Sequence, residues 1–147
     1  MFEEYLDFAV GMAREAGRIQ LSYFRGDDLA MKTKSNVSDV VTCADRESEE
    51  LIVRSILERY PTHAILGEEG GARGDAASEW RWVVDPLDGT TNYSQGLPVF
   101  CVSIALQYRG ETVVGVVYAP YLRELFTAVR GGGAFLRHTH HQAIIND

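Results

Sequence analysis

The sequence has few cysteines, a deficit of positive charge and no long apolar run. Its two cysteines, Cys43 and Cys101, are too few and too widely spaced for a disulfide framework or a zinc knuckle, so both are predicted to be small core residues of a cytosolic protein. Lysine and arginine number 14 against 21 aspartate and glutamate residues, which leaves a formal charge of −7. Because a negative surface repels nucleic-acid phosphates, non-specific binding of DNA or RNA is not expected.

The other absences narrow the class of protein. No apolar run approaches the ~20 residues that a membrane span needs, and the first five residues include two glutamates and no basic residue, unlike the basic start of a secretory signal. Hydrophobic residues make up 46% of the 147 and charged residues 24%, which excludes a disordered, collagen-like or coiled-coil chain. We therefore expect one globular cytoplasmic domain that makes no contact with a membrane.

Two amphipathic helices are predicted in the first part of the chain. Apolar side chains recur at helical spacing over residues 2–24. The polar stretch over residues 35–39 is predicted to be a loop. Thr42, followed three residues later by Asp45, resembles a capping box that opens the second helix, and Pro61 ends this helix.

The rest of the chain reads mainly as strands. Short links join several of these runs, and short links are typical of antiparallel neighbours, because a parallel crossover needs a dozen or more residues. The sequence therefore predicts an α+β fold in which two long helices pack on an antiparallel sheet. The predicted strands cover residues 80–84, 99–108, 112–118 and 125–129.

Negative charge gathers between Gly67 and Asn92, where six acidic residues face only two arginines. Within this stretch an apolar strand delivers Asp85 and Asp88 into one turn, and Pro86 between them has a fixed φ and no N–H. The carbonyl of Leu87 adds a third oxygen at the same point. Hard oxygen ligands that leave positions for water and substrate suit Mg²⁺.

The residues that follow suit an anion. Gly89, Thr90 and Thr91 can present successive backbone N–H groups to a phosphate. A metal site beside a phosphate cradle predicts hydrolysis of a phosphate ester. The alternative is a plain hairpin turn, since Asp-Gly after an apolar strand is a common turn sequence. An EF-hand loop and a Walker or dinucleotide loop are both excluded by the spacing of the acids and glycines.

Four segments, taken together in this order, resemble the inositol monophosphatase family of Mg²⁺-dependent, lithium-sensitive sugar phosphatases. The resemblance extends to about Phe135 and implies the first half of a layered αβαβα fold. Lys34 precedes the first segment. The segments are Ser38-Asp39-Val40-Val41-Thr42-Cys43-Ala44-Asp45, Gly67-Glu68-Glu69, Trp82-Val83-Val84-Asp85-Pro86-Leu87-Asp88-Gly89-Thr90-Thr91-Asn92-Tyr93 and Gly131-Gly132-Gly133-Ala134-Phe135.

The resemblance implies two or three Mg²⁺ ions and assigns their ligands. Glu68, Asp85 and the carbonyl of Leu87 would hold the first ion. Asp85 and Asp88 would share the second, and Glu68 would reach a third through its other oxygen.

The resemblance also implies catalytic roles. Asp45 and Thr90 would form the pair that orients and deprotonates the metal-bound water, and Glu68 is also expected to be catalytic. The N–H groups of Gly89 and Thr90 would hold the phosphate. For Asp45 alone, a helix cap is the alternative reading. Glu69 is expected to be a solvated or supporting acid, and Lys34 a loop charge near the site.

The pattern of the family ends abruptly. Relatives have a second half whose Trp-Asp…Ala-Gly motif supplies another metal-binding aspartate, and nothing after Phe135 replaces it. We expect residues 1–136 to be the amino-terminal metal-binding domain and residues 137–147 to be an off-pattern, disordered tail, including the histidines from His138 to His141. A truncated or frameshifted product, with the carboxy-terminal domain absent, is the hypothesis that fits this pattern.

The expected function is therefore a Mg²⁺-dependent phosphomonoesterase acting on inositol monophosphate or a related sugar phosphate, homodimeric in its intact form. A nucleotide 3′-phosphatase of the same superfamily is the first alternative, although Lys-Glu-Phe usually follows Asp-Gly-Thr there and this chain has Thr91, Asn92 and Tyr93. The second is an inactive chain with a binding role, since some bacterial relatives associate with transcription machinery. The expected partner is a small phosphorylated polyol, with no direct contact to nucleic acid.

Overall fold

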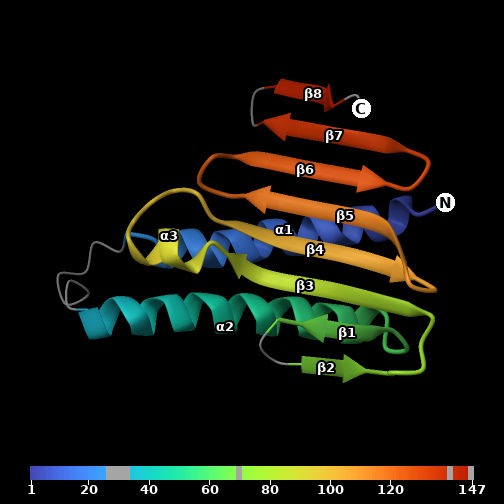
Figure 1. Cartoon of the computed structure of the whole chain (residues 1–147), viewed down its shortest axis with the longest axis horizontal. Helices are drawn as coiled ribbons and strands as arrows, with labels where there is room; N and C mark the ends of the chain where they lie inside the picture. Colours follow the sequence, from blue (N-terminus) through green and yellow to red (C-terminus); the bar gives the residue numbers. More distant parts are fainter. Residues whose placement is uncertain (26–33, 69–70, 139–140, 146–147) are drawn as a thin grey trace.

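Within the part of the chain that the structure describes, the fold consists of three helices and one eight-stranded sheet (Figure 1). The computed structural model describes residues 1–25, 34–68, 71–138 and 141–145, with the backbone alone for 34–37 and 141–145. The strand order is β2-β1-β3-β4-β5-β6-β7-β8. The elements are α1 (Glu3–Tyr23), α2 (Lys34–Arg59), β1 (Ala64–Gly67), β2 (Gly71–Gly74), β3 (Trp80–Asp88), α3 (Thr90–Ser94), β4 (Cys101–Tyr108), β5 (Glu111–Ala119), β6 (Glu124–Val129), β7 (Gly133–His138) and β8 (His141–Ile145).

The predicted α+β class and the first helix are confirmed. The buried stripe of α1 is narrow and consists mostly of small residues, which lets the helix lie close to the sheet: Ala9, Met12, Ala13, Ala16, Gly17 and Gln20. Leu21, predicted on this stripe, is 38% exposed. Helix α1 packs against α2, β4 and β5.

Helix α2 begins earlier than the sequence predicts. The segment 35–39, predicted to be a loop, is helical, and Thr42 lies well inside the helix. Its hydroxyl donates to the carbonyl oxygen of Ser38 over 3.0 Å, the usual bond of a threonine within a helix, so it does not cap one. The capping-box prediction is therefore wrong, and so is the reading of Asp45 as a helix cap.

The sheet is antiparallel except for one pair. Strands β3 to β6 form the predicted meander. Strand β1 pairs in parallel with β3, with Ile65 opposite Trp82 and Gly67 opposite Val84. This pairing corrects the purely antiparallel expectation, and it brings the end of β1 beside the acidic end of β3.

The tail differs from the disorder predicted for it. Strand β7 continues to His138, and the backbone of residues 141–145 forms β8 on the edge of the sheet. Residues 137–138 and the backbone of 141–145 therefore continue the antiparallel sheet rather than leaving it.

The main core lies between the two long helices and the sheet. Trp82, Ile52, Ile56 and Ile104 are almost completely buried there. Cys43 and Cys101 are free thiols and only half-buried, so neither is the core residue that was predicted. None of the helices in the described ranges is long and apolar enough to cross a membrane.

Candidate active site

The candidate site starts at an irregularity in β3. Asp85 pairs with Ser103 and Asp88 with Cys101, so β3 has one more residue than β4 between these pairs. Pro86 lies in this bulge, where its missing N–H leaves no ladder bond unmade. A bulge turns its strand and re-aims the side chains next to it. Both carboxylates are thereby delivered at the end of the strand.

Asp85 is the most perturbed acid of this region. It is half-buried, and its Oδ1 atom is buried without a hydrogen-bond partner. Burial, followed by a hydrogen bond with Glu68 and the charges of Glu68, Asp88 and Asp45, raises the pKa of Asp85 to about 7. A buried oxygen with no partner, surrounded by acids, is a position at which a cation would be stabilised.

Asp88 lies on the other side of the bulge and is exposed. The thiol of Cys101 donates to its Oδ2 atom over 3.8 Å. Burial, together with the charges of Asp88 and Asp85, raises the pKa of Cys101 to about 11. The thiol therefore stays neutral near pH 7 and adds no further negative charge to the site.

Gly89 turns the chain into the short helix α3. Its φ of 89° is left-handed, and a Cβ there would lie 2.8 Å from the carbonyl oxygen of Val99, so only glycine fits this position. Thr90 is the first residue of α3, and the N–H groups of a first helical turn have no acceptor within their own helix. The Tyr93 hydroxyl donates to the carbonyl oxygen of Gln20 over 2.7 Å, which ties α3 to α1.

The bulge is supported from behind. The side chain of Leu87 is 2% exposed and packs with four neighbours: Phe24, Ala44, Tyr93 and Phe100. Gln20, which is completely buried, donates through Nε2 to the carbonyl oxygen of Pro86 and to the hydroxyl of Ser48, the latter over 3.3 Å. One amide side chain thus connects α1, α2 and the bulge.

The residues suit a hard cation by their chemistry. All the side-chain atoms that could bind a metal here are carboxylate oxygens, the ligand type that Mg²⁺ takes in proteins. Within the described ranges, no three acidic, histidine or cysteine side chains already form a group that could hold a metal ion. Asp85 and Glu68 share a hydrogen bond, so each carboxyl group uses one of its oxygens in this bond. An ion would have to displace that shared proton.

The structure brings most of the predicted residues together. Asp45, Glu68 and Asp88 lie close enough to Asp85 to raise its pKa, although they come from α2, the end of β1 and β3. Thr90 follows directly at the start of α3. The side chain of Lys34 and the whole of Glu69 lie outside the described residues.

Sequence reasoning missed the supporting residues. Gln20 falls on the apolar stripe of α1 and Ser48 among the acids of α2, and no sequence pattern marks either as polar and buried. The sequence gives one indirect indication for Ser48: it lies three residues from both Asp45 and Leu51, so it shares a helix face with them.

Comparisons of sequence and structure relate the chain to known proteins. The inositol monophosphatase family model matches residues 1–145. The chain is 52% identical over 130 residues to the Nus factor SuhB of Pasteurella multocida, covering 88% of this chain and 48% of that protein. It is 43% identical over 136 residues to the inositol monophosphatase of Dictyostelium discoideum, covering 91% and 50%.

A solved structure shows the same fold. The inositol monophosphatase from Anabaena (Nostoc) sp. PCC 7120 aligns with a TM-score of 0.78 at 38% identity, over 93% of this chain and 48% of that one. The chain therefore spans about half the length of the relatives it matches. By sequence and by fold, it belongs to the inositol monophosphatase family.

Proposed function

We propose that this chain carries the metal-binding and water-activating residues of a Mg²⁺-dependent phosphomonoesterase. One observation carries the proposal: Asp85 has a buried, unpartnered oxygen, and burial together with three neighbouring acids raises its pKa to about 7. A fold gains no stability by gathering acids in this way. Binding a divalent cation offsets the cost, because the cation neutralises the repulsion and fills the missing contact.

The proposed ligands are Glu68, Asp85, Asp88 and the carbonyl oxygen of Leu87. When bound, Mg²⁺ would lower the pKa of a coordinated water and neutralise charge on the phosphate. Two or three ions are proposed, as the resemblance implies.

Asp45 and Thr90 are proposed to act on the water. A threonine hydroxyl can accept a proton from water while donating its own proton to a carboxylate. This pair can therefore deprotonate the water and orient its oxygen toward phosphorus. Glu68, a neighbour of Asp85, is proposed as a third catalytic residue. The N–H groups of Gly89 and Thr90 are proposed to bind the phosphate oxygens, supported by the left-handed turn that starts α3.

The proposed substrate is inositol monophosphate or a related sugar phosphate. The name of the Dictyostelium discoideum relative, inositol monophosphatase, supports this choice. A nucleotide 3′-phosphatase remains the alternative within the enzyme class, and Thr91, Asn92 and Tyr93 after the Asp-Gly-Thr sequence favour the inositol type.

A chimeric protein tests the proposal. Residues 1–135 of this chain would be joined to the second half of the Dictyostelium discoideum inositol monophosphatase, which this chain does not overlap. We expect the chimera to release phosphate from inositol 1-phosphate only when Mg²⁺ is present, and Asp85→Asn to abolish the release. The intact Dictyostelium protein is the positive control. This chain by itself is expected to show little or no turnover.

A role as a Nus factor is the second candidate, because the Pasteurella multocida relative bears that name at 52% identity. The two candidates separate in the same experiment. A folded chimera that binds Mg²⁺ but releases no phosphate from inositol 1-phosphate or adenosine 3′-phosphate would reject the enzyme, and the binding role would take its place.

A further inference from the structure

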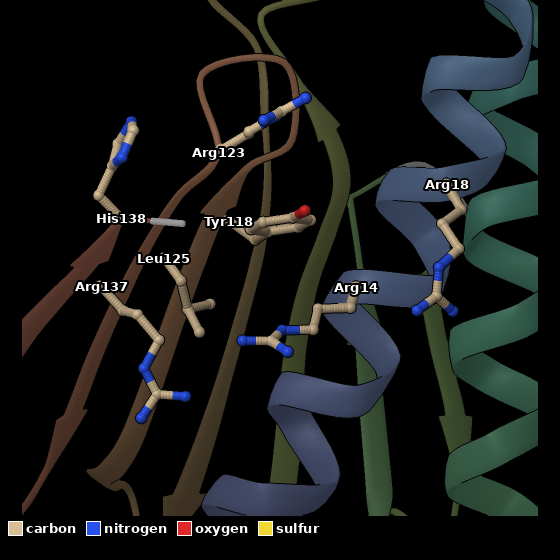
Figure 2. A pocket seen from close by; sticks show the side chains of 7 residues that line it. All are labelled: Arg14, Arg18, Tyr118, Arg123, Leu125, Arg137 and His138. Carbon is tan, nitrogen blue, oxygen red and sulfur yellow. The ribbon is translucent and has the colours of Figure 1, made fainter. Parts of the chain in front are cut away.

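A second charged feature lies away from the acids, beside α1. Figure 2 shows arginine side chains from α1, from the turn between β5 and β6 and from β7 around one pocket, with Tyr118 and Leu125 between them. The pocket has a volume of about 370 Å³, within the range of small-molecule sites. Its lining consists of Arg14, Arg18, Tyr118, Arg123, Leu125, Arg137 and His138.

Within the described part of the chain, none of the four arginines of this pocket forms an ion pair with an acid. Elsewhere Arg59 pairs with Glu4 over 2.7 Å and Arg109 with Glu79 over 3.2 Å, and Arg130 also pairs with Glu111. Among the described residues, no side chain forms an ion pair or hydrogen bond with the guanidinium groups of the pocket. The described residues that line the pocket include no acid either, although the chain carries a charge of −7.

Two well-packed side chains, Leu125 and Tyr118, form the floor of the pocket. Leu125 is 4% exposed and belongs to the main core. A Cβ on Gly17 would lie 2.6 Å from the ring of Tyr118. Glycine at this position therefore lets the tyrosine ring lie directly against α1, which fixes a rigid aromatic surface between Arg14 and Arg123.

We propose that this pocket binds a compact polyanion with clustered phosphate groups. A guanidinium group presents a planar fork of donors that matches phosphate oxygens in pairs. Four such groups around one small pocket match the charge of a ligand that carries three or four negative charges. The pocket uses α1, β5, β6 and β7, whereas the acids come from α2, β1 and β3, so this is a separate site that does not depend on the proposed function.

Calorimetry with sodium tripolyphosphate tests the proposal, in EDTA so that no metal can bridge the probe to the acids. The wild-type chain should bind one tripolyphosphate. The double variant Arg18→Gln, Arg123→Gln should lose at least about tenfold in affinity, since it removes two charge-assisted contacts. Both side chains are exposed, so the variant should keep the circular-dichroism melting curve of the wild type.

The matched control is Arg73→Gln, Arg81→Gln. These exposed arginines lie on β2 and β3, outside the pocket, and their loss changes the net charge equally. The control should bind tripolyphosphate within twofold of the wild type. Equal losses in the two double variants, or no binding by the wild type, would overturn the proposal.

A comparison of ATP with tripolyphosphate identifies the source of the phosphate groups. Tighter binding of ATP, lost in Tyr118→Leu, would assign a nucleoside polyphosphate whose base stacks on the tyrosine ring. Equal binding of the two probes would assign recognition of the phosphates alone.

Discussion

At the scale of single residues, the candidate site combines groups that titrate near neutral pH with groups that only hold the backbone. Asp85 belongs to the first kind, because its environment raises its pKa to about 7. Gln20 belongs to the second kind, because it contacts the carbonyl of Pro86 and no carboxylate. The two kinds are distinguishable by experiment.

The proposed water-activating pair gives the first prediction. In the chimera described above, Thr90→Ala or Asp45→Asn should lower kcat by ~10²–10⁴, the usual contribution of positioned proton transfer. Neither substitution should change Mg²⁺ affinity much. Steady-state phosphate release and calorimetry measure the two quantities. A variant that lost its metal but kept its kcat at saturating Mg²⁺ would show that the pair is misassigned.

Gln20 gives the second prediction. Gln20→Leu leaves the carbonyl of Pro86 and the hydroxyl of Ser48 without their donor, so it should lower the free energy of unfolding by about 1–3 kcal/mol. It should also weaken Mg²⁺ binding although Gln20 is not a ligand. Urea denaturation and calorimetry test both effects. Ser48→Ala is the control, because it keeps the bond to Pro86 and should leave Mg²⁺ affinity nearly unchanged.

At the scale of elements, an aromatic cluster joins α1, the end of α2 and the sheet. His63 stacks on Tyr60 with ring centroids 4.8 Å apart, and its Nδ1 atom accepts from the indole N–H of Trp82 over 3.0 Å. This bond requires the neutral ring. Burial lowers the pKa of His63 below its usual 6.5.

The third prediction follows from the sign of that shift. Below about pH 6.5 the unfolded chain takes up a proton at this histidine that the folded chain resists, so stability falls as the pH falls. For this one histidine, the free energy of unfolding changes by at most about 1.4 kcal/mol per pH unit. Urea denaturation between pH 5 and 8 measures it. His63→Asn keeps an acceptor for Trp82 but does not titrate, so its slope should be smaller; an unchanged slope would contradict the assignment.

Periodicity predicts the elements well where side chains alternate or repeat along one stretch. Strands β4 to β6 and helix α1 follow from such local patterns. The parallel pairing of β1 with β3 does not, because pairing between strands separated by other residues depends on the whole fold. The start of α2 was missed because Ser38 and Thr42 are typical of loops and caps, while here the threonine bonds within its helix.

The candidate site divides in the same way. The acids and glycine of the Asp85–Thr90 turn carry their chemistry in their residue types, so they were predictable. The buried donor Gln20 is not, because a glutamine on an otherwise apolar stripe reads as an edge residue. Its role depends on a contact 66 residues away along the chain.

At the scale of the whole molecule, the length of the relatives matters most. The chain spans about half of each, and apolar side chains such as Leu66 and Val117 remain 41% and 37% exposed on the sheet. Exposed apolar surface favours association.

The fourth prediction concerns this surface. Sedimentation should show that the 147-residue chain self-associates as its concentration rises, while the chimera with a second half forms one defined species. Substituting Val117→Thr in the 147-residue chain should reduce its association. If the 147-residue chain stays monomeric at every concentration, the exposed apolar side chains of its sheet do not drive association, and the prediction is wrong.

The most direct test of the account is calorimetry of Mg²⁺ or Mn²⁺ on the chain itself. The ion should bind the wild type more tightly as the pH rises through 7, with release of a proton below that pH, because Asp85 must lose its proton to become a ligand. Asp85→Asn should weaken binding at least about tenfold, whereas the distant Asp75→Asn should not. Equal affinity in the wild type and Asp85→Asn would contradict the account.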